Sequence, residues 1–281
     1  MSDTLLLGTN SGDIYTLNIL TGNLNLIYST KLDNENINGF SIFENTIYAI
    51  SSHSVYEFNL NYNLIHIIST YDKLPYYKSI NVNKTQIQVV SSKYNAYTIL
   101  DKNYKFKDTF SYPVYGLLGD NNNYLLINDL TTDKDFIYLN IGVNDFYKDS
   151  FCGLIKLDKN LNELERINSG YNSYRSSIIN NNIFTLCNKN KIESLPPGLL
   201  VNNKLKLKFD NNFELYDFSV NEKYICIVGY FRNNKDKDKF ECGGFVSVFN
   251  INYNKLNYFK IDGTGAISSC ILLNNDLTDI K

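Results

Sequence analysis

Six similar stretches, in each of which a β-strand is followed by a polar turn and a second strand, constrain this chain more than any other feature. An Asn or Asp begins each turn, as in "DIYTLNILTGNLNLIY" at 13–28 and "GFVSVFNINYNKLNYFKI" at 244–261. The six turn residues are Asn18, Asn59, Asp101, Asp158, Asn202 and Asn250. Consecutive turn residues are 41, 42, 57, 44 and 48 residues apart, so one supersecondary unit recurs along the 281-residue chain.

A strongly apolar strand precedes each of these hairpins. Examples are "TLLLGT" at 4–9 and "YICIVGY" at 224–230, and such near-continuous apolarity is typical of a strand covered on both faces. The later units have a further strand before it, but the first unit does not. The C-terminal segment "GAISSCILLNND" at 265–276 is a spare strand. The sequence therefore predicts four antiparallel strands in each unit, with the two ends of the chain completing one unit together.

A period of roughly 40 to 50 residues built only from strands is typical of β-propeller blades. The prediction is an all-β fold, a six-bladed β-propeller of four-stranded antiparallel blades, closed by the C-terminal strand joining the N-terminal blade. The alternative is a pair of β-sandwiches, which predicts neither six similar hairpins nor a spare strand. We expect a single domain over 1–281, with blades at about 265–281 plus 1–30, 37–70, 76–110, 112–168, 173–209 and 214–262.

In "LLLGTNSGDIYTLNILTG" the chain resembles the β-propeller superfamily, and the WD40-like repeats most, through two strands joined at glycines and a closing "TG" turn. This resemblance covers nearly the whole chain. No blade has the Gly-His or Trp-Asp pair of WD40 repeats, so the hydrogen-bond network of those repeats carries over to no residue here. The resemblance implies that the first strand of each blade lines a central channel. It also implies that the loops between blades gather on one face, where binding sites are usual.

The connections expected between blades are rich in tyrosine, and one of them contains Arg175, one of three arginines. Tyr and Arg often dominate binding interfaces, so these loops predict an aromatic recognition face. With 23 tyrosines in the chain, the alternative is that these side chains pack the ends of the blades. The connection at 229–244 contains "NNKDKDK", which is expected to form a mobile, solvated loop with a contact tip beside it; the alternative is an ordinary long hairpin. The candidate binding residues are Tyr76, Tyr77, Lys78, Tyr112, Tyr115, Tyr174, Arg175, Tyr216, Phe231 and Arg232.

The sequence contains no recognisable catalytic or metal-binding motif. There is no GxSxG, HExxH, P-loop or dinucleotide pattern, and the two histidines and five cysteines lack metal-ligand spacing. The carboxylates nearest to the expected channel mouth are interpreted as turn residues; they are Asp72, Asp120, Asp129 and Asp217. We therefore expect no catalytic residue, no metal and no cofactor, and we expect the cysteines to be free thiols.

Net charge and hydropathy exclude some classes of partner. The formal net charge of −2 gives no basic field for nucleic acid, and no apolar run is long enough to span a bilayer. The sequence predicts a non-enzymatic interaction scaffold that binds a protein or peptide, as a subunit of a larger assembly. Nucleic acid is expected only within a nucleoprotein assembly, and the expected location is the cytoplasm, with the nucleus left open. The alternative function is a propeller-type hydrolase or lyase with an active site at the channel mouth.

Overall fold

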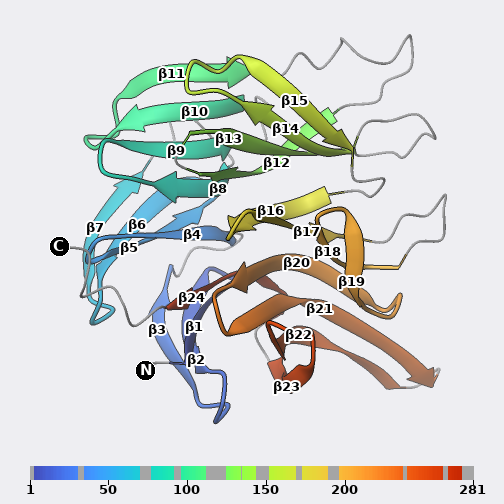
Figure 1. The fold of residues 1–281 in the computed structure, drawn as a ribbon. Coiled ribbons are helices and arrows are strands. Elements are labelled where there is room, and N and C mark those ends of the chain that lie inside the picture. The colour runs from blue at the N-terminus through green and yellow to red at the C-terminus, as the bar shows by residue number, and fades with distance from the viewer. Residues whose placement is uncertain are drawn as a thin grey trace. The chain divides into compact units, whose positions relative to one another are not determined.

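The computed structural model describes residues 3–30, 35–69, 77–91, 96–111, 125–133, 135–143, 152–168, 173–188, 196–236, 239–261 and 265–273. Within these ranges the regular elements are all β-strands, and none is a helix that could cross a membrane. The strands form six four-stranded sheets, so the chain is a six-bladed β-propeller, as the sequence predicts. The chain divides into two compact units with three blades each (Figure 1). One unit comprises Met1–Lys73 with Asn212–Lys281, and the other comprises Leu74–Asn211.

The first unit contains the only sheet formed by both ends of the described chain. This sheet has the order β24 (Ile267–Leu273), β1 (Thr4–Thr9), β2 (Asp13–Asn18) and β3 (Leu24–Ser29). The second sheet comprises β4 (Ile37–Phe43), β5 (Thr46–Ser51), β6 (Ser54–Asn59) and β7 (Leu64–Ser69). The third comprises β20 (Phe213–Val220), β21 (Tyr224–Asp236), β22 (Lys239–Asn250) and β23 (Lys255–Ile261).

The second unit repeats this arrangement without exchanging strands between distant parts of the chain. Its first sheet comprises β8 (Tyr77–Val82), β9 (Gln86–Ser91), β10 (Ala96–Asp101) and β11 (Phe106–Ser111). The next comprises β12 (Leu125–Thr132), β13 (Ile137–Val143), β14 (Gly153–Leu157) and β15 (Glu163–Asn168). The last comprises β16 (Ser173–Ile179), β17 (Asn182–Cys187), β18 (Gly198–Val201) and β19 (Lys204–Lys208). We call the first strand of each blade, namely β24, β4, β8, β12, β16 and β20, its A strand.

The closure predicted from the spare C-terminal strand is confirmed. β24 pairs antiparallel with β1, from Thr4 opposite Leu273 to Thr9 opposite Ile267. Figure 1 shows the two strands, red and blue, side by side. Ile267 is fully buried and Leu272 is 5% exposed, in a core that also contains Leu5. The last strand thereby removes the open edge that β1 would otherwise present.

The second strand of each blade is apolar because it is covered on both faces. In β1, Leu5, Leu6 and Leu7 are all fully buried. Leu5 and Leu7 enter a core with Val228 of β21, whereas Leu6 enters a different core with Ile47 of β5. Alternate residues of a strand point to opposite faces, so one strand contributes to both neighbouring cores.

The recurring turn residue makes the same hydrogen bonds in most blades. Asn59 Oδ1 accepts the backbone N–H groups of Asn61 at 2.9 Å and Asn63 at 3.0 Å. Asp101, Asp158 and Asn250 accept hydrogen bonds from the equivalent two N–H groups of their own turns. The fourth residue of each of these turns has a positive φ; these residues are Tyr62, Tyr104, Leu161 and Tyr253. Asn202 differs. It and Asn203 have φ values of 48° and 62° and form a two-residue hairpin turn.

Each of the six A strands contains a β-bulge at the equivalent position. In β8, for example, Tyr77 lies opposite Ser91 and Ser79 lies opposite Val90, which leaves Lys78 as the extra residue. The bulged residues are Asn38, Lys78, Asn128, Tyr174, Tyr216 and Ser268, and the residues after them are Gly39, Ser79, Asp129, Arg175, Asp217 and Ser269. An extra residue changes which face the following side chains point to. The bulge therefore redirects the A-strand side chains at the same place in every blade.

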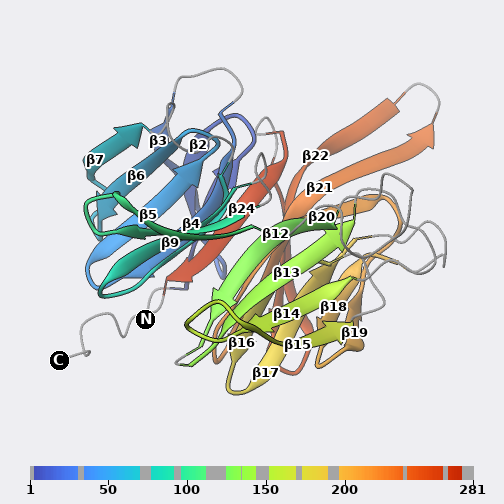
Figure 2. The same ribbon diagram turned by 90° about the horizontal axis from the view of Figure 1, so that it is seen from above.

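The connection at 229–244 forms the long hairpin and not the loop. β21 continues to Asp236 and β22 begins at Lys239, and the two strands stay paired at Arg232 opposite Cys242. Pairing of β21 with β20 stops at Phe231, so the hairpin continues as a two-stranded ribbon. Figure 2 shows both strands, in orange, extending beyond β20. Strand pairing uses backbone groups and therefore continues through the charged residues as far as Asp236, opposite Lys239.

Candidate functional site

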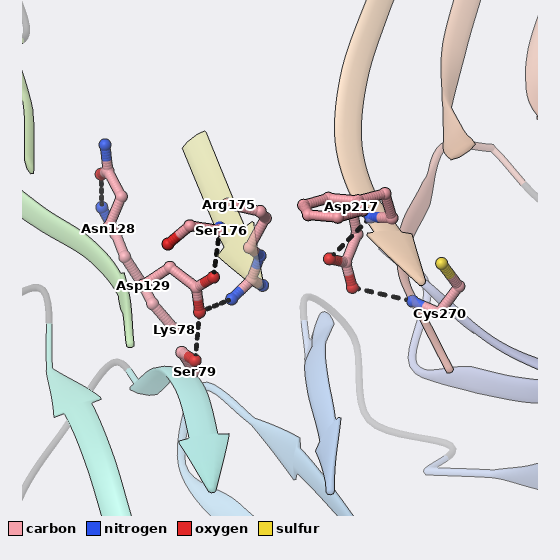
Figure 3. A network of polar contacts seen from close by, with 9 residues as sticks. Lys78, Ser79, Asn128, Asp129, Arg175, Ser176, Asp217 and Cys270 are labelled. Atoms are coloured by element: carbon pink, nitrogen blue, oxygen red, sulfur yellow. Dashed lines mark hydrogen bonds and ion pairs between the residues drawn. The ribbon is translucent and has the colours of Figure 1, made fainter. Parts of the chain in front are cut away.

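Asp129 in β12 is the centre of a buried polar cluster in the second unit (Figure 3). Its Oδ1 atom accepts hydrogen bonds from Arg175 Nη1 at 3.0 Å and from the Ser79 hydroxyl, and its Oδ2 atom accepts the Ser176 N–H at 3.0 Å. Ser79 lies in β8, and Arg175 and Ser176 lie in β16. One carboxylate thus connects the A strands of three blades. The Asp129 and Arg175 side chains are 7% and 11% exposed, so this ion pair is largely removed from water.

Lys78 adds a second positive charge beside this ion pair. Its ammonium group donates a hydrogen bond to Asn128 Oδ1 at 3.1 Å. Burial of the amine, together with the nearby positive charge of Arg175, lowers the pKa of Lys78 to about 8. Two cations therefore accompany one carboxylate. We call Lys78, Ser79, Asn128, Asp129, Arg175 and Ser176 the Asp129 cluster.

The bulges explain why these residues meet. Lys78 and Asn128 are the bulged residues of two consecutive blades, and they form a hydrogen bond with each other. Ser79, Asp129 and Arg175 are the residues that follow three consecutive bulges. Because the bulge recurs at the same position, it aligns equivalent side chains from neighbouring A strands.

Asp217 in the first unit occupies the equivalent position of its own blade and makes one of the same hydrogen bonds as Asp129. Asp217 also follows a bulge, and its Oδ2 atom accepts the N–H of Cys270 in the A strand of the adjacent blade at 2.9 Å. The equivalent bond of Asp129 is the one from Ser176. An A strand is an edge strand of its own blade, so such bonds satisfy outward N–H groups. Asp129 also forms an ion pair with Arg175.

These positions correct the interpretation of the aspartates as turn residues. Asp129 and Asp217 lie within strands and are 5% and 8% exposed, so the turn interpretation is wrong for both. Asp72 and Asp120 lie outside the described residues.

Buried polar atoms next to the Asp129 cluster lack hydrogen-bond partners. Asn140 in β13 is fully buried and lies directly opposite Asp129 in the strand register. Both polar atoms of its amide and the hydroxyl of Ser176 have no partner in the part of the chain that the structure describes. Buried polar groups are normally paired with protein or ordered water. The interior side of the cluster therefore retains capacity to bind water or a polar ligand group.

A second pair of candidate residues meets in the first unit. Tyr216 donates its hydroxyl proton to Glu214 Oε2 at 2.7 Å, and Arg232 Nη2 lies 3.5 Å from Glu214 Oε1. The Arg232 side chain is 58% exposed and its guanidinium lies 5.5 Å from the ring centroid of Tyr230. Exposed ion pairs of this kind contribute little to stability. This pair is a surface feature, unlike the buried Asp129 cluster.

Two of the remaining candidate residues are buried, and the others lie outside the description. Tyr77 is 1% exposed and Phe231 is 4% exposed, so both side chains are packing residues. Tyr174 is a bulged residue of β16, and its side chain lies outside the description. Tyr76, Tyr112 and Tyr115 also lie outside the described residues. Among the described residues, no group of three or more His, Cys, Asp or Glu side chains is arranged to hold a metal ion.

The sequence interpretation missed Ser79, Asn128 and Ser176 and assigned Asp129 the wrong role. A usable signal existed in "LLINDLTT" at 125–132, where Asn and Asp interrupt an apolar strand. A carboxylate inside such a strand is buried and requires a charged or hydrogen-bonding partner. That partner, Arg175, lies 46 residues away in the sequence and is brought close only by the fold.

No protein-family model matches the chain, and no curated protein matches it. Solved structures do. A protein of unknown function from Bacteroides caccae has 10% identity and a TM-score of 0.63, over 96% of this chain and 98% of that one. A chain of a nidogen/laminin complex has 11% identity and a TM-score of 0.62, over 95% and 97%. The hydrazine synthase of Kuenenia stuttgartiensis has 10% identity and a TM-score of 0.55, over 82% and 68%. At such low identity the likeness establishes the fold alone, and that fold is the β-propeller.

Proposed function

We propose that the protein is a non-enzymatic interaction module that binds a protein or peptide partner at the bulged ends of the A strands in the second unit. Lys78 and Arg175 are the anchor residues. The observation that carries this proposal is the Asp129 cluster itself, in which two cations that are distant in sequence lie close together. The carboxylate of Asp129 holds Arg175, and the amide oxygen of Asn128 holds Lys78. An arginine fixed by a buried ion pair loses little conformational entropy on binding, so it is a suitable anchor for a partner.

The state of Asp129 favours binding over acid–base catalysis. Both of its carboxylate oxygens accept hydrogen bonds, one of them from a buried backbone N–H. A carboxylate committed to three donors is poorly placed to accept a proton from a substrate. The nidogen/laminin structure shows that a chain of similar fold occurs in a protein complex. That likeness supports a protein-binding role only in general terms.

Affinity purification from the source cells, with mass spectrometry, tests this proposal. The wild type is compared with Lys78→Met and with Lys208→Met, which removes an equal charge from an exposed position of β19. We expect a set of partner proteins that is retained by Lys208→Met and lost with Lys78→Met. If the wild type and both variants retain the same proteins, or none retains any, the proposed role of this face is wrong.

One observation favours the alternative of a propeller-type lyase. An amine with a pKa of about 8 beside a second cation resembles the environments that activate catalytic lysines. Such an amine would condense with a carbonyl substrate to form an imine and release water. Incubating the full chain with a small keto acid and sodium borohydride tests this alternative. Reduced adducts confined to Lys78 would favour the lyase, whereas uniform labelling of exposed lysines would oppose it.

A further inference from the structure

We propose that the Asp129 cluster is a binding site for one carboxylate group, supplied by an acidic side chain or the C-terminus of the peptide partner. This inference rests on the proposed function, and it specifies the chemistry of the group that the partner presents. Lys78 is the direct ligand and Arg175 supplies the second positive charge.

The balance of charge is the first reason. Arg175 and Asp129 form an ion pair 3.0 Å apart, so the charge of Lys78 is the one left over. Among the described residues, the charged group that acts on Lys78 is Arg175 on β16, which is itself paired with Asp129 on β12; β9 contributes no charged side chain. A positive charge removed from water is costly unless an anion accompanies it. One monoanion makes the group of charges neutral.

Hydrogen-bonding capacity is the second reason. The ammonium of Lys78 has three N–H donors, and within the described ranges its one acceptor is Asn128 Oδ1. Asn140 and Ser176 supply unpaired polar atoms on the buried side. A carboxylate with two oxygens accepts from Lys78 and, directly or through water, from the Asn140 amide N–H groups and the Ser176 hydroxyl. Asn140 Oδ1 is itself an acceptor and is satisfied only by a bridging water.

The net charge of the Asp129 cluster also discriminates between anions. A carboxylate carries one negative charge, whereas a phosphate monoester carries about −1.5 to −2 at neutral pH. A dianion would leave the site with excess negative charge close to Asp129. The cluster is therefore expected to favour a carboxylate over a phosphate.

Titration of Lys78 in the full-length protein tests the inference without requiring the natural partner. The lysines are converted to ¹³C-dimethyl-lysine, and the Lys78 signal is assigned by its loss in Lys78→Met. The probes are sodium acetate, inorganic phosphate, and blocked pentapeptides with a central Glu or a central Gln, all at constant ionic strength. A bound carboxylate favours the charged amine, so acetate and the Glu peptide should raise the pKa of Lys78 by about one unit. By linkage, the Glu peptide should then bind about fivefold more weakly at pH 9 than at pH 7.

Lys208→Met is the matched control and should behave like the wild type. Lys78→Met should bind the Glu peptide at least about tenfold more weakly and without this dependence on pH. The inference is overturned if neither acetate nor the Glu peptide moves the Lys78 titration, if the Gln peptide acts as strongly, or if phosphate acts more strongly than acetate. Partner proteins that depend on Lys78 without any carboxylate effect would sustain the proposed function and refute this inference. A carboxylate effect without any partner protein that depends on Lys78 would sustain this inference and refute the proposed function.

Discussion

Replacing Asp129 with Ala is the sharpest perturbation of this molecule, because it removes one partner from a buried ion pair. Arg175, whose side chain is 11% exposed, would lose this carboxylate. Removing one partner of a buried ion pair costs about 3–5 kcal/mol. The Ser176 N–H would also lose its acceptor, at about 1–3 kcal/mol. With partial relaxation, we expect Asp129→Ala to lower the free energy of unfolding by about 4–6 kcal/mol.

Asp217 provides the matched control within the same chain. It accepts an equivalent N–H from the adjacent blade, and losing that acceptor costs about 1–3 kcal/mol. We therefore expect Asp217→Ala to be less destabilising than Asp129→Ala, which also removes one partner of the buried ion pair with Arg175.

Urea unfolding followed by far-ultraviolet circular dichroism and by tyrosine fluorescence measures these values, since the chain has 23 tyrosines and no tryptophan. At about 2 °C per kcal/mol for a chain of this size, the melting temperature of Asp129→Ala should fall by about 8–12 °C. The double variant with Arg175→Met should recover at least about 1 kcal/mol relative to additivity, because it removes the orphaned charge. The reasoning is refuted if Asp129→Ala is no more destabilising than Asp217→Ala, or if the two effects are additive within about 0.5 kcal/mol.

The structure makes four further predictions. Deleting 265–281 removes β24, whose buried residues Ile267, Leu272 and Leu273 contribute about 1.5–3 kcal/mol each. We expect the truncated chain to lose cooperative unfolding, measured by calorimetry, and to aggregate, measured by light scattering. A soluble, equally stable product would contradict this. Arg175→Met should raise the pKa of Lys78 from about 8 toward its ordinary value of 10.5, as seen in the ¹³C-dimethyl titration, and no change would rule out the coupling. Because the folded-state pKa lies below the unfolded one, the wild type should also gain stability relative to Lys78→Met as the pH rises from 8 toward 10.5. Asn181 has a φ of 61° in an exposed two-residue turn. In urea unfolding, Asn181→Gly should therefore stabilise the protein by a few tenths to about 1 kcal/mol, and Asn181→Val should destabilise it by about 1–2 kcal/mol. The reverse order would be inconsistent with this turn.

The fold could be predicted because its signals are local and repeated. A polar residue such as Asn59 or Asp101 makes short-range bonds with its own turn, so it marks that turn wherever it occurs. The apolar strand before each hairpin reports burial on both faces, as in β1. Six weak signals at a regular spacing reinforce one another. The spare strand then determined how the chain closes.

The site could be predicted only in part, because it depends on irregular backbone. Lys78 and Arg175 were identified from composition, as cations among aromatic residues. Asp129, the partner of Arg175, was interpreted as a turn residue, because a single extra residue in each A strand shifts the two-residue alternation on which strand interpretation relies. The same shift explains Tyr77, which was expected in a loop and instead begins a strand with its side chain 1% exposed. No residue type marks a bulge by itself.

The pairing of β1 with β24 has a consequence for how the protein is made. β1 is synthesised long before its partner β24, so the edge of β1 stays unpaired while the 22 strands between them emerge from the ribosome. Contacts between residues so far apart in sequence form slowly, because closing the loop between them carries a large entropic cost. An apolar strand with one open edge is prone to pair with other chains. Nascent chains should therefore be most susceptible to misassembly, and most dependent on chaperones, until β24 is released.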